Sequence, residues 1–152
     1  MENQDMPLLF RLFTEIGIVS QLSGAMLEAR LPEGMTGAQF GVLNHLVRVG
    51  DGGTPLDIAR AFQVAKTTMS HTLSGLVKQG LVEMRPNPDD GRSKCVWLTQ
   101  TGRQRREVAI GMVAQGYSKL AGQLSTTKVA MLADELGALR VVLDANRVPF
   151  KE

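Results

Sequence analysis

Apolar residues recur at steps of three and four along most of the chain, which is the spacing of helices that bury one face. Polar and glycine-rich stretches that carry helix start and stop signals separate these apolar stretches. Thr36, Thr54 and Thr99 each stand where a hydroxyl would cap a helix, and Gln39 completes a capping box with Thr36. The pattern predicts six helices, over residues 8–30, 37–49, 55–62, 66–79, 100–120 and from 126 toward the C-terminus.

The helix predicted over residues 8–30 is apolar around more than half of its circumference. One stripe of large apolar side chains is accompanied by a second set off the stripe, which includes Leu8 and Ile18. In a chain of 152 residues, a helix that needs burial on two sides usually finds the second cover in a partner subunit. Cover by the same chain is the alternative. We expect a homodimer, with a similar apolar pattern in the last helix, where Val129 and Leu132 belong to the repeat.

A short helix, a three-residue turn and a longer helix follow one another over residues 55–79, which is a helix-turn-helix arrangement. One face of the longer helix carries no acidic residue, although a surface helix would normally mix Glu with its Lys. Small hydroxyls and Lys suit hydrogen bonds to phosphates and base edges. The inward positions are predicted to be Leu56, Ala59 and Phe62 on the short helix and Met69, Leu73, Leu76 and Val77 on the longer one. The outward face would hold Lys66, Thr67, Thr68, Ser70, His71, Thr72, Ser74, Gly75 and Lys78.

Two strand-like runs, residues 81–85 and 94–98, flank a segment rich in Pro, Asn, Asp and Gly. This order predicts a β-hairpin with a long tip. A hairpin this short gains little from its own hydrogen bonds, so we expect it to pack on the helices through Val82, Met84 or Trp97. An ordinary mobile loop is the alternative for the tip.

The charge is unevenly distributed along the chain. Residues 60–106 hold nine Lys or Arg and three acids, a net charge of +6, whereas the other 105 residues carry eight bases and twelve acids. A basic middle between acidic flanks is typical of a protein that binds a polyanion, and a solvated basic face is the alternative. Arg103, Arg105 and Arg106 begin a predicted helix, where they oppose its dipole, so they lie beside an anion or are tolerated for another reason.

The order of elements resembles the winged helix-turn-helix plan of the MarR (multiple antibiotic resistance regulator) family. Three segments carry the resemblance, in order and at the expected spacing. They are residues 59–73 for the helix-turn-helix, 78–82 for the exit into the wing, and 90–94 with 98–102 for the wing. The last two are similar to the family's wing signature, Asp-x-Arg through Leu-Thr-x-x-Gly.

This resemblance implies a mainly α (α+β) fold in two parts. Residues 36–99 would form the winged helix-turn-helix DNA-binding domain, and residues 1–35 and 100–152 the dimerisation helices. It also implies a homodimer on a pseudo-palindromic duplex site, with half-sites ~34 Å apart. Many members are repressors that small, often aromatic or anionic, ligands release at the junction of the two parts, so we expect a small-molecule effector here.

In such a complex, the recognition helix (66–79) would enter the major groove, and the wing (81–98) would bring Arg92 into the flanking minor groove. Asp90 would orient the guanidinium of Arg92. Arg85 and Lys94 would bind phosphates near the wing. The implied DNA-binding residues are Lys66, Thr67, Thr68, Ser70 and His71 on the helix and Arg85, Asp90, Arg92 and Lys94 on the wing.

Three positions depart from the family pattern. Ala65 stands where Ser or Thr usually caps the recognition helix, a loss of ~1 kcal/mol unless Thr67 or Thr68 compensates. His71 replaces a frequent Arg, and Gly75 replaces a frequent basic residue. The last two departures concern which bases are read and not the general mode of binding.

Other functions are less well supported by the residues. His45 and His71 lie on different predicted helices, no His/Cys pair has metal-ligand spacing, and residues 50–53 lack the Lys-Ser/Thr of a phosphate loop. We therefore predict neither an enzyme nor a cofactor. A winged-helix module that binds a protein, such as an anti-repressor, is one alternative, and a redox sensor at Cys95 is another. Met26 and Met112 are candidate linings of an effector pocket.

The expected location is the cytoplasm. A single cysteine allows no intramolecular disulfide and fits a reducing compartment. No apolar run approaches the ~20 residues of a membrane-spanning helix. Glu2 and Asp5 stand where a signal peptide would be basic.

Overall fold

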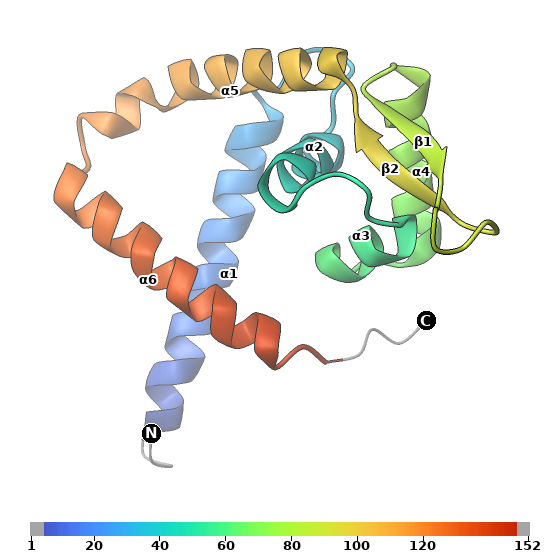
Figure 1. The fold of residues 1–152 in the computed structure, drawn as a ribbon. Coiled ribbons are helices and arrows are strands. Elements are labelled where there is room, and N and C mark those ends of the chain that lie inside the picture. Colours follow the sequence, from blue (N-terminus) through green and yellow to red (C-terminus); the bar gives the residue numbers. More distant parts are fainter. Residues whose placement is uncertain (1–4, 149–152) are drawn as a thin grey trace.

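The computed structural model describes residues 5–148 and contains the predicted helices and hairpin. In Figure 1, α5 runs along one side of the molecule, with the winged-helix unit near its N-terminal end and α6 returning from its C-terminal end. The mainly α winged helix-turn-helix fold expected from the sequence is confirmed. The elements are α1 (Met6–Glu28), α2 (Gly37–Val49), α3 (Pro55–Phe62), α4 (Lys66–Lys78), β1 (Val82–Pro86), β2 (Lys94–Leu98), α5 (Gln100–Ala121) and α6 (Thr126–Ala145).

Side-chain caps explain why α2 and α3 begin where they do. Thr36 Oγ1 accepts a hydrogen bond from the Gln39 N–H at 3.2 Å, and Gln39 Oε1 accepts one from the Thr36 N–H at 3.1 Å. Thr54 and Asp57 form a second capping box at the start of α3. The Thr54 hydroxyl also donates to the Asp57 carboxylate at 2.6 Å, and this bond is the main reason why the pKa of Asp57 is lowered.

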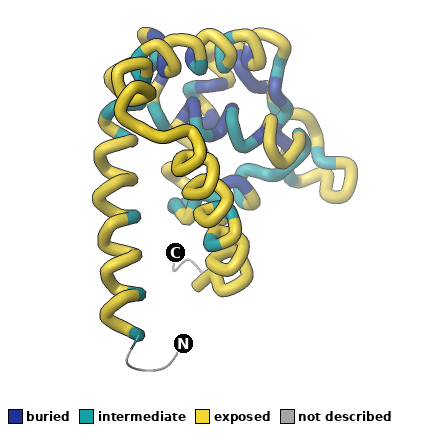
Figure 2. The backbone as a smooth tube through the Cα atoms, turned by 90° about the vertical axis from the view of Figure 1, so that its left-hand side faces the viewer, coloured by how far each residue is buried: buried dark blue, intermediate teal, exposed yellow. Residues whose placement is uncertain are grey.

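The hydrophobic core lies inside the winged-helix unit. Leu43, Leu46, Leu76, Val82 and Val96 are among its fully buried side chains, and they come from α2, α4 and both strands. Figure 2 shows the buried residues gathered in this unit and under the neighbouring part of α5. This core holds the helix-turn-helix and the wing in a fixed relation to each other.

Two residues of α4 lie on the opposite side from their prediction. Thr72 is buried, because its hydroxyl donates to the Thr68 carbonyl at 3.2 Å and therefore needs no solvent partner. Val77 is 41% exposed and lines a surface cavity beside Met84. On α3, Ala59 is buried as predicted, and so is Ile58, which was not among the predicted inward positions. Leu56 and Phe62 are half-buried.

The hairpin pairs antiparallel, with Val82 opposite Leu98 and Pro86 opposite Lys94. Val82 is in the core and Met84 packs against it, as predicted. Trp97 does not join them. Its ring lies on the other face of the hairpin, 4.5 Å from the Arg85 guanidinium carbon, because alternate residues of a strand face opposite sides.

The first turn of α5 is packed tightly against the end of α4. Thr99 caps α5 by accepting from the Gly102 N–H at 2.9 Å, and its hydroxyl lies within hydrogen-bonding distance of the Gly80 and Leu81 carbonyls. A Cβ on Gly102 would lie 2.0 Å from the Leu81 carbonyl oxygen. The Leu-Thr-x-x-Gly motif therefore has a structural reason: the hydroxyl ties the wing to α5, and the glycine admits the backbone of Leu81.

Helices α1 and α6 contribute no buried residue. Both carry large exposed apolar side chains, among them Phe10 at 76% and Leu22 at 62% exposure on α1 and Val141 at 60% on α6. The long exposed course of both helices is visible in Figure 2. Within residues 5–148, no helix combines the length and apolar character needed to cross a membrane.

Candidate nucleic-acid interface

The outer face of α4 is a surface of hydroxyl and cationic side chains. Its predicted DNA-binding residues are all exposed, and α4 contains no acidic residue. The opposite side of the helix is anchored in the core through Met69, Leu73 and Leu76. The helix is therefore fixed by its inner side, while its outer side is available to a ligand. The exposed residues are Lys66, Thr67, Thr68, Ser70 and His71.

The two ends of α4 are stabilised differently. Ala65 occupies the N-cap without a side-chain hydrogen bond, and neither Thr67 nor Thr68 caps the helix in its place. At the other end, the Leu81 N–H donates to the Leu76 carbonyl and the Gly80 N–H to the Val77 carbonyl, both at 2.9 Å, with Gly80 at φ +67°. This is a Schellman motif. The N-terminal amides of α4 are thus left without a side-chain acceptor, next to Lys66.

Gly75 departs from the family pattern for a reason of packing. A Cβ at this position would lie 2.6 Å from Nε2 of Gln39, the residue that closes the capping box of α2. A larger residue would displace Gln39, which is itself only 8% exposed. The contact between Gly75 and Gln39 could not be predicted from the sequence, because 36 positions separate the two residues.

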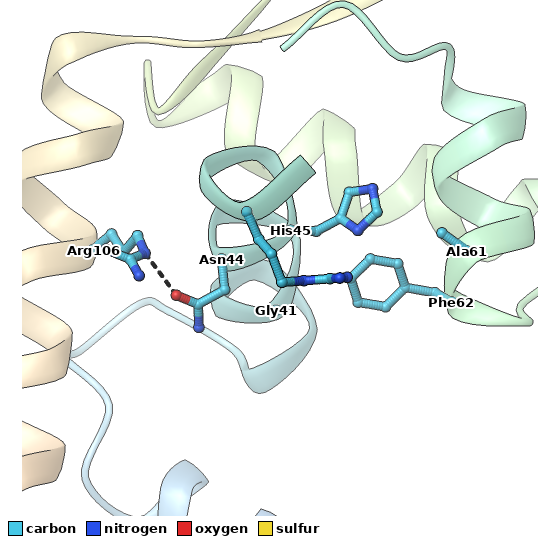
Figure 3. A pocket seen from close by; sticks show the side chains of 7 residues that line it. Gly41, Asn44, His45, Ala61, Phe62 and Arg106 are labelled. Atoms are coloured by element: carbon cyan, nitrogen blue, oxygen red, sulfur yellow. Dashed lines mark hydrogen bonds between the residues drawn. The ribbon is translucent and has the colours of Figure 1, made fainter. Parts of the chain in front are cut away.

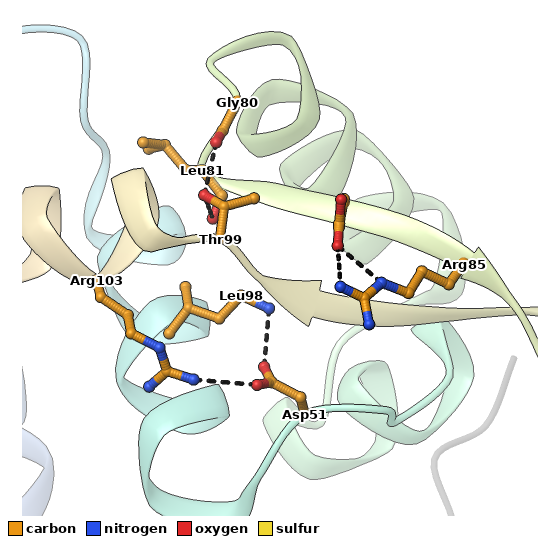
Figure 4. A network of polar contacts seen from close by, with 8 residues as sticks. Asp51, Gly80, Leu81, Arg85, Leu98, Thr99 and Arg103 are labelled. Atoms are coloured by element: carbon orange, nitrogen blue, oxygen red, sulfur yellow. Dashed lines mark hydrogen bonds and ion pairs between the residues drawn. The ribbon is translucent and has the colours of Figure 1, made fainter.

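Strand β1 holds Arg85 in a defined position, one residue before the end of the hairpin ladder at the tip. Its guanidinium lies over the Trp97 ring at 4.5 Å, and its Nε donates to Glu83 Oε1 at 2.7 Å. Figure 4 shows the ion pair between Arg85 and the neighbouring carboxylate on the hairpin. The residue expected to bind phosphate is therefore exposed but already partly neutralised by Glu83. Lys94, the other expected phosphate ligand at the wing, is exposed at the start of β2.

Hydrogen bonds close the tip of the wing. The Asn87 N–H donates to the Ser93 carbonyl at 3.1 Å, and the Asn87 side-chain amide donates to Ser93 Oγ at 2.8 Å. Asp90 Oδ1 accepts from the backbone N–H of Arg92 at 3.0 Å. Among residues 5–148, none of the ion pairs joins the side chains of Asp90 and Arg92. Asp90 instead fixes the backbone from which the exposed Arg92 side chain extends.

Three of the nine bases in the basic middle face the protein. Arg103 pairs with Asp51 at 3.1 Å, Arg105 donates to the Glu33 carbonyl at 2.8 Å, and Arg106 donates to the Asn44 side chain at 2.6 Å. These contacts explain how three arginines are tolerated near a helix start. Of the two explanations left open by the sequence, the second applies to Arg103 and Arg106, whose side chains bond α5 to the winged-helix unit.

A cavity of about 430 Å³ lies between α2, α3 and α5 (Figure 3). His45 meets Phe62 edge-on there, with ring centroids 5.4 Å apart. Burial and then the charges of Arg48 and Arg147 lower the pKa of His45, so the imidazole is neutral at pH 7. The lining contains no acidic residue; it consists of Gly41, Asn44, His45, Arg48, Ala61, Phe62 and Arg106.

The remaining candidates from the sequence are Cys95, Met26 and Met112. Cys95 is buried at 5% exposure in β2, where it acts as a small apolar side chain. Neither Met26 nor Met112 lines the cavity beside His45. In the described part of the chain, no cluster of three or more His, Cys, Asp or Glu could hold a metal ion.

Comparison with known proteins identifies relatives of the same architecture. The sequence model of the MarR family matches residues 33–93, from the turn before α2 to the tip of the wing. The chain is 33% identical over 119 residues to the multiple antibiotic resistance protein MarR of Escherichia coli, a match that covers 77% of this chain and 82% of that protein. It is 30% identical over 125 residues to the transcriptional activatory protein BadR of Rhodopseudomonas palustris, covering 80% and 70%.

A solved structure is similar over an even greater length. The crystal structure of a mutant E. coli MarR complexed with operator DNA matches with a TM-score of 0.69 and 28% identity, covering 91% of this chain and 99% of that one. The family model's match includes α4, β1 and the tip of the wing, whose geometry is described above. The chain belongs to the MarR family of transcriptional regulators.

Proposed function

We propose that two copies of this chain bind a pseudo-palindromic duplex site and repress transcription there, and that a small molecule releases them. The exposed, acid-free face of α4 carries this proposal. Lys66 and the hydroxyls beside it can contact phosphates and base edges in a major groove, which accommodates one helix. The structural likeness to a MarR that is complexed with operator DNA supports the same mode of binding.

The wing supplies the second part of the proposed interface. Arg92 extends from a closed turn, and a guanidinium of this kind is suited to the negative potential of a narrow minor groove. Arg85 and Lys94 lie on the two strands just before and just after the tip, where they would bind the backbone phosphates on either side. The site we propose comprises these three residues, Asp90 as the support of the turn, and the exposed residues of α4.

The proposed dimer rests on the apolar surfaces of α1 and α6. Side chains such as Phe10, Leu22 and Val141 are exposed in the single chain, although surfaces of this kind are normally covered in a soluble protein. A second copy would cover them across a twofold axis. On this account, residues 1–35 and 100–152 form the dimerisation part and residues 36–99 the DNA-binding part. Half-sites would then lie ~34 Å apart, one turn of duplex.

We place the proposed effector in the cavity beside His45. Arg48 and Arg106 line it, a neutral imidazole and a phenyl ring form one side, and α3 of the helix-turn-helix contributes Ala61 and Phe62. A small molecule bound there would contact both the first helix of the helix-turn-helix and α5, which begins the second segment of the proposed dimerisation part.

The test is duplex binding as a function of salt, with Lys66→Ala compared with Lys128→Ala. Lys128 is an exposed lysine on α6, so the control removes the same charge outside the proposed interface. We expect wild-type affinity to fall by orders of magnitude between ~50 and ~200 mM salt, and Lys66→Ala to reduce the slope by ~1. The control should keep the wild-type slope. A wild-type chain that binds no duplex even at low salt would contradict the proposal and favour a protein partner for this surface.

A further inference from the structure

Asp51 occupies a position between the long helix and the wing that no sequence motif indicates. It follows the end of α2, and its side chain is 18% exposed. Its Oδ1 accepts from the Leu98 N–H in β2 at 2.8 Å, and its Oδ2 accepts from Arg103 Nη2 in α5 at 3.1 Å (Figure 4). One carboxylate therefore joins the last residue of the wing to the first turns of the helix that follows it.

The two residues after Asp51 continue this contact along β2. The Gly52 N–H donates to the Val96 carbonyl, and the Val96 N–H donates to the Gly53 carbonyl, both at 2.9 Å. The backbone of residues 51–53 thus lies along the edge of β2 that β1 leaves free. The carboxylate bond to Leu98 extends the same row by one position.

This edge also supports the ring of Trp97. Gly52 has φ +96°, and a Cβ built on it would lie 3.5 Å from Trp97 Cζ2, an ordinary van der Waals distance, so the glycine is a near neighbour of the indole with room for one carbon between them. The same ring carries the Arg85 guanidinium at 4.5 Å. Arg103 is therefore bonded to Asp51, the backbone after Asp51 is bonded to β2 beside Trp97, and the indole of Trp97 carries Arg85.

We propose that Asp51 is a positioning residue for DNA binding: it fixes the base of the wing against α5 and thereby sets the place of the Arg85 guanidinium. This inference rests on the proposed function, in which Arg85 binds a phosphate. Without the carboxylate, Arg103 would stand unpaired near a helix N-terminus, where the dipole disfavours a cation. The Leu98 N–H would also lose its acceptor, and residues 51–53 would lose the first of their hydrogen bonds to β2.

The experiment is a double-mutant cycle on duplex binding with Asp51→Ala, Arg85→Ala and the combination. We expect each single change to weaken binding about tenfold and to reduce the salt slope by ~1, since the same phosphate contact is lost in both. Because Asp51 acts through Arg85, the double variant should bind no more than about twofold more weakly than Arg85→Ala alone. An additive loss of about a hundredfold, or an unchanged salt slope in Asp51→Ala, would overturn the proposal.

Asp51→Asn separates positioning from folding. It retains an oxygen that accepts from Leu98 but weakens the pair with Arg103, so the chain should fold with the reduced salt slope of Asp51→Ala. If Asp51→Asn kept the wild-type salt slope, the ion pair between Asp51 and Arg103 would not position Arg85, and this part of the proposal would be wrong.

Trp97 is the single tryptophan and gives a readout that does not require DNA. We expect its fluorescence emission to shift in Asp51→Ala and, to a similar extent, in Arg85→Ala. If the wild-type chain binds no duplex, the proposed function fails, while this emission shift still tests the positioning of the wing. Unchanged emission in Asp51→Ala would contradict the inference whatever the outcome with DNA.

Discussion

Gly102→Ala is predicted to destabilise the fold at the junction of the wing and α5. The added Cβ would lie 2.0 Å from the Leu81 carbonyl oxygen and 2.8 Å from Leu98 Cδ1. The oxygen belongs to the backbone and to the hydrogen bonds around Thr99, so it cannot rotate away as a flexible side chain would. Since Cβ contacts shorter than 3.0 Å are essentially never seen, the two segments must separate by about 1 Å.

The size of the effect follows from two opposing terms. Overpacking of this kind costs ~1–3 kcal/mol, and a clash with backbone belongs to the upper part of that range. Replacing glycine by alanine inside a helix returns up to ~1 kcal/mol. The free energy of unfolding should therefore fall by about 1–2 kcal/mol, which for a chain of this size lowers Tm by about 2–8 °C.

Gly111→Ala provides the matched control on the same helix. No heavy atom lies within 4 Å of a Cβ built at Gly111, so only the helix propensity changes and Tm should stay the same or rise. Both variants are compared by thermal and urea denaturation at one protein concentration, because a dimer's Tm depends on concentration. If Gly102→Ala proved as stable as Gly111→Ala, the close contact between α5 and Leu81 would be refuted.

Three further predictions concern the wing, the terminal helices and His45. Arg92→Ala should weaken operator binding by ~1–3 kcal/mol and leave the oligomeric state intact; unchanged affinity in a fluorescence titration would remove the wing tip from the mechanism. Leu12→Asp or Leu139→Asp should lower subunit association, because a charge would enter an apolar interface, and an unaltered dimer in sedimentation would contradict this. The pKa of His45 is lowered in the folded chain, so the unfolded chain binds more protons and stability should fall as pH drops below ~6.5. In His45→Gln this dependence should be weaker, as measured by urea denaturation between pH 5 and 7.5; an identical dependence would show that His45 does not contribute.

The sequence predicted helix boundaries well because the signals for them are local. A hydroxyl at Thr36 or Thr54 and its partner three residues later are enough to specify a helix start, and both capping boxes are present. The faces of α4 were harder to assign, since a helix packed against several elements buries more than one stripe. Thr72 could be buried only because its hydroxyl finds an acceptor one turn earlier, which composition does not reveal.

The polar contacts of the site could not be predicted, since they join residues distant in sequence. Asp51 meets Arg103 across 52 positions and Leu98 across 47, and nothing near Asp51 marks it as a partner of the wing. Likewise, the count of basic residues in the middle of the chain did not distinguish Arg106, which bonds to Asn44, from Arg92, which is exposed. The periodicity of α1 and α6 did indicate surfaces that the single chain leaves exposed.

Footprinting of the purified protein on genomic DNA tests the central claim most directly. A regulator of this kind often binds beside its own gene, so fragments from that region are the first substrates. We predict a protected site with two related halves, whose centres lie one turn of the duplex apart, bound by two copies of the chain. Protection of no fragment at low salt, or binding by a single copy at one half-site, would contradict the account.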